Sequence, residues 1–165
     1  MKMLRILPIV ALVLVMAVSF GCSSRQEVAS TPDESPEGMS AAEIAARELE
    51  EAKRTIVNET IYFTYDSFEL SAESRAILSR KAEIMKTYPD LLVQIAGHCD
   101  ERGTNEYNLA LGERRARAAS QYLVMLGVNP SQLEIISYGE ERPADSGHND
   151  AAWAKNRRDE FALVW

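Results

Sequence analysis

The alternation of apolar and polar residues divides the chain into an uncharged segment near its start, a polar stretch, and a series of strand-like and helix-like patterns. Lys2 and Arg5 precede an uncharged, mainly apolar run over residues 6–20. A basic segment followed by an apolar run of this length is typical of an export signal, because it is too short for a membrane span of about 20 residues. We therefore expect residues 1–21 to be a signal peptide.

Cys22 indicates the type of signal. It follows a small residue, Gly21, directly after the apolar run. This arrangement resembles the lipobox of bacterial lipoproteins, in which the cysteine thiol receives diacylglycerol and becomes the mature amino terminus, although Phe20 departs from the usual pattern. Several acyl chains would anchor the protein stably, since one chain binds a membrane only marginally. Ser23 resembles the residue found at this position in lipoproteins of the outer membrane, and the alternative is an uncleaved anchor with an incidental cysteine.

The next part of the chain, residues 22–54, has the composition of a tether. Residues 23–39 are rich in Ser, Pro and Glu and hold few large apolar side chains, so they cannot bury enough surface to fold. From Ser40 to Arg54 the residues are strong helix formers, but the apolar ones are mostly small. We expect a solvated helix there, and a folded domain over residues 55–165.

Strand-like and helix-like patterns alternate within this domain. Four segments are rich in β-branched, aromatic or other apolar residues and predict strands at residues 61–65, 91–96, 133–138 and 161–165. A first helix is expected from the N-cap Ser71 to the break at Pro89, a second from about Asn105 to Gly127, and a short third over residues 150–156. The apolar face of the first helix consists of Ile77, Leu78, Lys81, Ile84, Met85 and Tyr88. The order β-α-β-α-β-(α)-β predicts a two-layer α/β (α+β) sandwich.

Charge and cysteine content narrow the classes of protein. The 165 residues are 46% apolar, which is enough for one core. Removal of residues 1–21 would take away Lys2 and Arg5 and no acidic residue, lowering the net charge from −7 to −9. Such an acidic chain argues against nucleic acid as a partner. Cys99 is then the only cysteine besides Cys22, so no internal disulfide is expected.

The loop after the second predicted strand carries the candidate binding residues. Loops at strand ends often hold ligands, because a rigid scaffold presents their polar groups. Asp100 can accept hydrogen bonds from an ammonium group, and Arg115 on the following helix can form a bidentate pair with a carboxylate. Together they would suit a zwitterionic ligand. The alternative, which spacing alone favours, is that Asp100 caps the helix or pairs with Arg114 or Arg115 for structure.

Catalysis is a weaker interpretation of the same loop. Neighbouring residues in an extended chain point to opposite sides, so His98 and Cys99 are not placed as a base and a nucleophile. His148 lies in a distant polar loop, and the spacings typical of metal ligands are missing. We expect no enzymatic activity, no cofactor and no metal.

Several long motifs, in the right order, resemble the OmpA-like peptidoglycan-binding domain family. They are the run from Gly97 to Ala116, then Tyr122-Leu123, Gly127-Val128, Ser137-Tyr138-Gly139-Glu140-Glu141-Arg142-Pro143 and Lys155-Asn156-Arg157-Arg158. The resemblance extends from about Tyr62 to the carboxyl terminus. With the lipobox and the tether, the whole chain is similar to the lipoproteins of that family.

This resemblance implies a ligand and roles for particular residues. Asp100 would bind the ammonium group of the diaminopimelate side chain in the peptidoglycan stem peptide, and Arg115 its carboxylate. The other positions that match the family's site are Tyr65 and Asp66, which contribute mainly backbone contacts, and Thr104, Asn108 and Leu111, which line or support the pocket. Arg158 matches a position that is either structural or near the ligand. Cys99 stands where many relatives carry Thr or Ala, so its thiol is not required.

The resemblance also implies partners and a location. The chain would be a non-catalytic outer-membrane lipoprotein, lipidated at Cys22 and facing the periplasm, that tethers the membrane to the cell wall. It would belong to the Tol system and bind TolB in competition with peptidoglycan. Two alternatives stay open, namely a wall-binding lipoprotein of a secretion or motility machine and a wall-processing enzyme.

Overall fold

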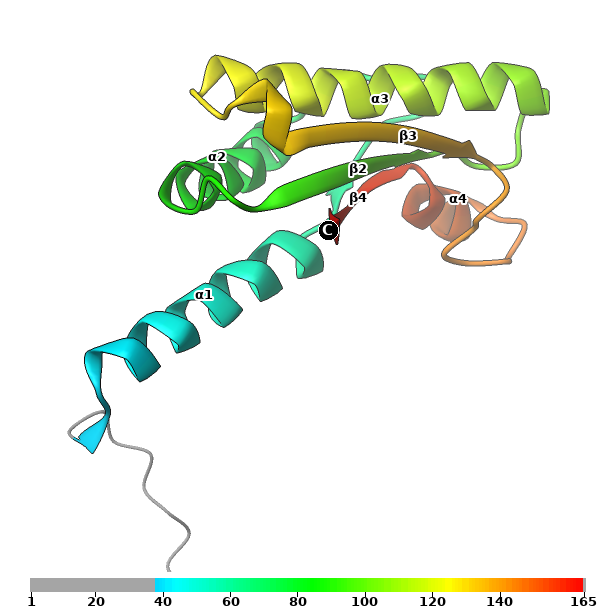
Figure 1. The fold of residues 1–165 in the computed structure, drawn as a ribbon. Helices are drawn as coiled ribbons and strands as arrows, with labels where there is room; N and C mark the ends of the chain where they lie inside the picture. Colours follow the sequence, from blue (N-terminus) through cyan, green and yellow to red (C-terminus); the bar gives the residue numbers. More distant parts are fainter. Residues whose placement is uncertain (1–37, 165) are drawn as a thin grey trace, which may run out of the picture. The chain divides into compact units, whose positions relative to one another are not determined.

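A computed structural model describes residues 38–164 of the chain (Figure 1). The predicted signal peptide, Cys22 and residues 23–37 of the predicted tether lie outside the described residues. The elements are α1 (Ala41–Asn58), β1 (Ile61–Tyr62), α2 (Ala72–Thr87), β2 (Leu92–His98), α3 (Asn105–Met125), the 3-10 helix η2 (Pro130–Gln132), β3 (Leu133–Gly139), α4 (Asp150–Asn156) and β4 (Arg158–Val164). None of the helices within residues 38–164 is long and apolar enough to cross a membrane.

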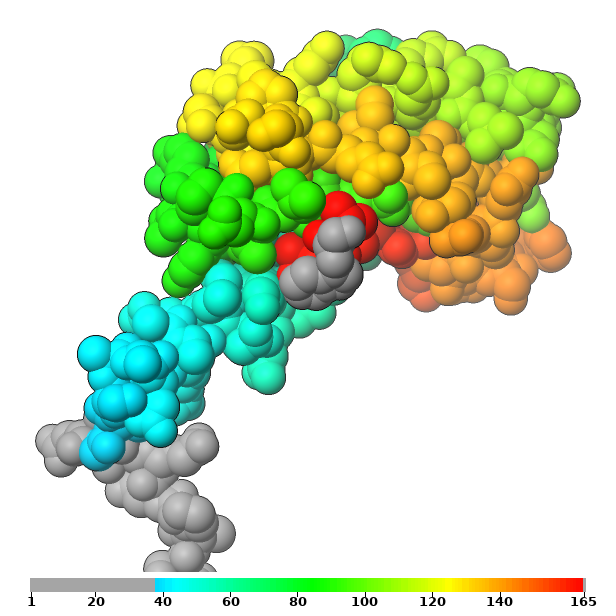
Figure 2. Space-filling view, viewed as in Figure 1, coloured from blue at the N-terminus to red at the C-terminus, as the bar shows by residue number. Residues whose placement is uncertain are grey.

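The strands form one mixed sheet in the order β1-β4-β2-β3. β2 runs parallel to β3, and β4 is inserted antiparallel to both β2 and β1. α2 and α3 lie together on one face of the sheet (Figure 1). In the space-filling view, the surface of α3 continues directly into that of β3 (Figure 2). The predicted α/β two-layer arrangement is confirmed.

The core lies between this sheet face and the two helices. Alternate strand residues point to one face of a sheet, and residues three or four apart share one face of a helix. The buried side chains follow both periods; the strands contribute Ile61, Val93, Ile95 and Phe161, and the helices contribute Leu78, Ala82, Met85, Ala116, Ala119 and Leu123. Both helices begin at hydroxyl caps, since the side chains of Ser71 and Thr104 accept the backbone N–H groups of Ser74 and Tyr107.

The helix before β1 differs from the expectation. Its start follows the prediction, because Ser40 and Glu43 form a capping box. The helix runs on to Asn58, however, and Ile56 is completely buried in the core. The buried Lys81 ammonium on α2 donates to the backbone carbonyl oxygens of Thr55 and Ile56. The boundary predicted at residue 55 therefore falls inside a helix whose last turn packs with the domain.

The first and last strands also differ from their predicted ranges. β1 stops at Tyr62, because the chain turns at Asp66, whose φ of 51° lies in the left-handed region. β4 begins at Arg158, three residues before the predicted start. Asp159 and Arg158 pair with Ile61 and Tyr62 in the sheet, although both are charged. A pattern of apolar residues does not include Arg158 and Asp159 in the strand, because both side chains are charged even though they are buried.

Candidate functional site

A close backbone contact fixes the site at one end of the sheet. A Cβ atom added at Gly97 on β2 would lie 2.0 Å from the carbonyl oxygen of Gly112 on α3. Only glycine allows the two backbones to come this close, because any side chain at position 97 would force one of them to move. The contact holds the end of β2, and the loop that contains Asp100, against the helix that carries Arg115.

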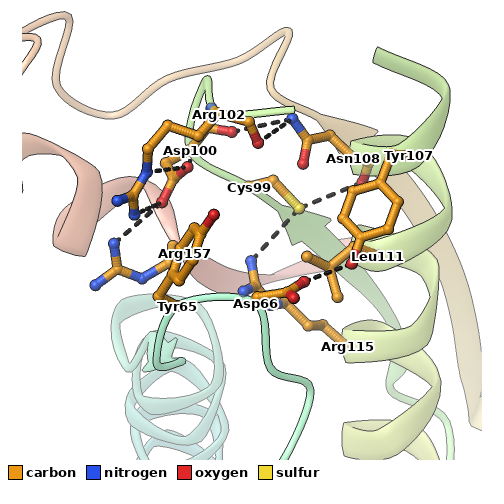
Figure 3. Close-up of a pocket in the computed structure, with 10 residues that line it drawn as sticks. All are labelled: Tyr65, Asp66, Cys99, Asp100, Arg102, Tyr107, Asn108, Leu111, Arg115 and Arg157. Atoms are coloured by element: carbon orange, nitrogen blue, oxygen red, sulfur yellow. Dashed lines mark hydrogen bonds and ion pairs between the residues drawn. The ribbon is translucent and has the colours of Figure 1, made fainter. Parts of the chain in front are cut away.

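The end of β2 and the loop after it, the first turns of α3, the loop after β1 and the residue between α4 and β4 together form a narrow pocket (Figure 3). Its lining residues are Tyr65, Asp66, Cys99, Asp100, Arg102, Tyr107, Asn108, Leu111, Arg115 and Arg157. Six residues expected at the site lie here, namely Tyr65, Asp66, Asp100, Asn108, Leu111 and Arg115. The cavity volume is about 20 Å³, roughly the space that one water molecule requires.

Asp100 is almost fully buried and is held by two arginines. Its Oδ1 accepts from the backbone N–H and the Nε of Arg102, both at 3.1 Å, and its Oδ2 accepts from Arg102 Nη2 at 2.7 Å and from Arg157 Nη1 at 3.1 Å. Burial by itself raises the pKa of Asp100, but the bonds from Arg102 and Arg157 outweigh it and lower the pKa below its usual value. A carboxylate has about four acceptor positions. All four are occupied, so an incoming cation must displace a donor.

Arg102 is sandwiched between two aromatic rings. Its guanidinium carbon lies 4.0 Å from the centroid of the Tyr65 ring and 4.3 Å from that of the Trp153 ring, an arrangement that stabilises a cation. The Trp153 indole in turn donates to the Glu101 carboxylate at 2.9 Å. Arg102 keeps 31% of its side chain exposed, whereas Arg157 keeps 15%. Of the two arginines on Asp100, Arg102 is the freer to move.

Arg115 is completely buried and bonds mainly to backbone. Its Nε donates to Ser67 O at 2.8 Å, Nη2 to Thr64 O at 3.3 Å, and Nη1 to His98 O at 2.7 Å and to Cys99 Sγ at 3.4 Å. These bonds use four of its five N–H donors. Burial lowers the pKa of Arg115 from its usual value. No carboxylate within residues 38–164 forms an ion pair with it, so this buried cation suits an anionic ligand group.

Asp100 and Arg115 converge on one pocket without pairing with each other. The structural alternative is wrong in its details, because Asp100 pairs with neither Arg114 nor Arg115 and Thr104, not Asp100, caps α3. Thr104 does not line the pocket. Arg158 is buried away from it, where Nη2 forms an ion pair with Glu160 at 2.6 Å.

The remaining lining residues shape the loops around the charges. The Asn108 amide donates to the carbonyl oxygens of Asp100 and Arg102 at 3.2 and 3.3 Å and also bonds the Glu140 carboxylate. The Tyr107 hydroxyl donates to the Asp66 carboxylate (Figure 3). Asn108 therefore holds the Asp100 loop, and Tyr107 ties α3 to the turn after β1.

The sequence reasoning missed Arg102, Tyr107 and Arg157 as pocket residues. Arg102 could have been found from its position two residues after Asp100, where a long cationic side chain folds back onto the carboxylate. Arg157 lies in the Asn156-Arg157-Arg158 motif, between α4 and β4, and spacing did not indicate which of the two arginines reaches the pocket.

The residues considered for catalysis are not arranged as a catalytic set. His98 is buried, and burial with the nearby Arg158 lowers its pKa to about 4. Burial raises the pKa of the Cys99 thiol to about 11, and its Sγ contacts Arg115 and the carbonyl oxygen of Asn108. The part of the chain that the structure describes contains no group of three or more His, Cys, Asp or Glu residues that could hold a metal ion.

Comparison with known proteins agrees with this fold. A sequence profile of the OmpA family matches residues 62–157. The chain is 45% identical to a peptidoglycan-associated lipoprotein of Pseudomonas aeruginosa, covering 98% of this chain and 99% of that protein. The corresponding protein of Pseudomonas putida is 43% identical, again over 98% and 99% of the two chains.

Solved structures show the same fold. The crystal structure of the peptidoglycan-associated lipoprotein from Burkholderia pseudomallei matches with a TM-score of 0.63 and 42% identity, covering 64% of this chain and 89% of that one. The C-terminal domain of Helicobacter pylori MotB matches with a TM-score of 0.61 over 65% and 84%, but at 24% identity this likeness concerns the fold alone. The chain belongs to the OmpA family. Within that family, it is a member of the peptidoglycan-associated lipoproteins.

Proposed function

We propose that the chain is an outer-membrane lipoprotein that binds peptidoglycan noncovalently and tethers the outer membrane to the cell wall. The observation that carries the proposal is the pocket that places Asp100 and Arg115 on either side of Cys99 (Figure 3). The names of its relatives, which associate them with peptidoglycan, support the same ligand. The proposed role is binding and not catalysis.

The chemistry of the pocket fits the side chain of diaminopimelate in the stem peptide, which ends in an ammonium and a carboxylate on one carbon. The carboxylate would take the unused N–H of Arg115, whose buried guanidinium forms no ion pair with a carboxylate within residues 38–164. A charge-assisted bond of this kind is about twice as strong as a neutral one. Arg115 therefore selects a ligand with a free carboxylate.

The ammonium group would bind Asp100 after a rearrangement. Arg102 and Arg157 occupy every acceptor position of the carboxylate, and the cavity of about 20 Å³ is too small for the ligand. Arg102 is the freer of the two arginines. Movement of Arg102 away from Asp100 would enlarge the pocket and, at the same time, expose the Asp100 carboxylate.

The other residues of the site would act on the shape of the pocket. Tyr65 and Asp66 offer backbone groups at the turn after β1, and Leu111 provides an apolar wall. Thr104 and Asn108 support the site indirectly, through the α3 cap and the bonds to the Asp100 loop.

The partners and the location of the protein complete the proposal. Acyl chains on Cys22 would hold the chain on the outer membrane, with the domain in the periplasm. Resemblance to the family's lipoproteins supports participation in the Tol system and binding to TolB in competition with peptidoglycan. Mass spectrometry of the native amino-terminal peptide tests the anchor, because an acylated Cys22 is the expected product and an uncleaved residue 1–21 segment would contradict it.

Retention on purified cell wall tests the binding site. Asp100→Asn and Arg115→Lys each keep the size of the side chain but remove the charge or the planar fork that the ligand requires. Both variants should lose most of their retention. The matched controls Asp90→Asn and Arg117→Lys, at exposed positions, should sediment with the wall like the unaltered protein. Equal retention of all variants, with circular dichroism confirming that they are folded, would exclude this pocket as the binding site.

A further inference from the structure

Asp159 is a buried carboxyl group that the proposed site does not use. It is the second residue of β4, opposite Gly97 on β2 and Ile61 on β1. Its side chain is 0% exposed, and neither Oδ1 nor Oδ2 has a hydrogen-bond partner among the described residues. An ionised carboxylate without hydrogen bonds is strongly unfavourable in such a place. Its charge must therefore depend on the few charged groups nearby.

Arg115 is the cation that acts on Asp159, and its Nη1 donates to His98 O, one residue after the Gly97 that pairs with Asp159. Burial raises the pKa of Asp159 well above its usual value, and the attraction of the Arg115 guanidinium lowers it in part. Cys99, at the end of β2, also interacts with both residues, and Arg157 and Asp100 act on Arg115 from the pocket side. The neighbours on β1 and β2, Ile61 and Gly97, carry no charge. Asp159 and a ligand carboxylate would thus share one cation.

We propose that Asp159 is a positioning residue that couples ligand binding to proton uptake. Ionised Asp159 neutralises the positive charge of Arg115 and repels a ligand carboxylate. When Asp159 is protonated, the positive charge of Arg115 is available to bind the ligand carboxylate. The balanced step is the binding of one ligand and one solvent proton to the form with ionised Asp159, which yields a complex with neutral Asp159. The inference rests on the proposed function, since it assigns the ligand carboxylate to Arg115.

Because of this coupling, the affinity for the ligand should depend on pH. A ligand anion beside Arg115 raises the affinity of Asp159 for its proton, and by reciprocity the proton raises the affinity for the ligand. Binding should therefore weaken as the pH rises through the titration of Asp159 in the free protein. Such couplings typically change affinity by about 5- to 150-fold. A merely structural Asp159 would keep one charge state and give no such slope.

Isothermal titration of the full-length chain with the peptide L-Ala-D-Glu-meso-diaminopimelate tests this coupling. Across the pH range in which the protein stays folded, the dissociation constant of the wild type should rise by at least about 5-fold from the acidic to the alkaline end. Asp159→Asn, which cannot ionise, should bind at the alkaline end about as tightly as the wild type at the acidic end. Glu160→Gln, its neighbour on the other sheet face, is the control and should keep the wild-type slope. Titrations in two buffers of different ionisation enthalpy should show proton uptake for the wild type and none for Asp159→Asn.

The outcomes separate this inference from the proposed function. Absence of binding by the wild type at every pH would overturn the proposed function and this inference with it. Binding with parallel pH profiles in the wild type and Asp159→Asn would overturn only the role of Asp159. If Asp159→Asn does not fold, the carboxyl ¹³C chemical shift of Asp159 in the wild type provides the test. Ligand binding should move this shift toward the value of a protonated carboxyl group. An unchanged resonance would contradict the coupling.

Discussion

Gly97 and Gly112 are in backbone contact across the interface between β2 and α3, and this contact sets the distance between the Asp100 loop and Arg115. A methyl group at Gly97 would lie 2.0 Å from the Gly112 carbonyl oxygen, a separation that forces the helix away from the sheet. Gly97→Ala should therefore lower the free energy of unfolding by about 1–3 kcal/mol, the usual range for overpacking. Urea denaturation measures this change.

The matched control for that substitution is Gly38→Ala. No atom lies within 4 Å of a Cβ added at Gly38, so Gly38→Ala should have the same free energy of unfolding as the wild type. Equal stability of the two variants would show that the helix and sheet have room to separate, and that the glycine contact does not position the site.

The last turn of α1 should be part of the cooperative domain. Ile56 is completely buried against α2 and the sheet, whereas Ile44 on the same helix is 38% exposed. Ile56→Ala should lower the free energy of unfolding by about 2–5 kcal/mol, as for other buried aliphatic side chains. Ile44→Ala should have less than about 0.5 kcal/mol of effect, the usual range at the surface. Similar values for both, measured by chemical denaturation, would place the domain boundary after α1.

His98 should make the fold sensitive to acid. Burial and Arg158 lower its pKa from 6.5 to about 4, so the folded state keeps the ring neutral while the unfolded chain takes up a proton below pH 6.5. The free energy of unfolding should consequently fall as the pH drops from 6.5 to 4. Replacement by a residue that does not titrate, His98→Asn, should remove this part of the slope.

The wild type is the comparison for His98→Asn. A His98→Asn profile that keeps the full wild-type slope between pH 6.5 and 4 would contradict a neutral, buried ring at position 98.

The helices and the layer order could be predicted from the sequence, because they depend on local signals. Ser71 and Pro89 bound α2, and Gly127, with a φ of 96°, follows α3. The start of β4 could not be predicted in the same way. Arg158 and Asp159 have charged side chains, and only long-range pairing makes them part of a strand, with β1 about 100 residues earlier in the chain and, for Asp159, also with Gly97 on β2.

The site was predictable as a pair of charges but not as a network. Asp100 and Arg115 lie on adjacent local elements, so the sequence could indicate them. The ion pair between Asp100 and Arg157 joins residues 57 positions apart. Likewise, the sandwich of Arg102 between Tyr65 and Trp153 requires three distant segments to meet. Contacts of this kind depend on the tertiary fold, which no local spacing specifies.

The pocket should discriminate between stem peptides by their free carboxylate. A peptide with lysine in place of diaminopimelate keeps the ammonium group but lacks the carboxylate that Arg115 would bind. The site would then leave the buried guanidinium without its anionic partner, and such a loss weakens binding strongly. Asp100→Asn should weaken both peptides, since both carry the ammonium group.

The most direct test is therefore a comparison of the two peptides on the wild type and on Arg115→Lys, by isothermal titration at one pH. We expect the wild type to bind the diaminopimelate peptide at least about 10-fold more tightly than the lysine peptide, which corresponds to about 1.4 kcal/mol. Arg115→Lys should lose most of this preference. Equal affinity of the wild type for both peptides would contradict the central claim that Asp100 and Arg115 hold the two ends of one zwitterionic group.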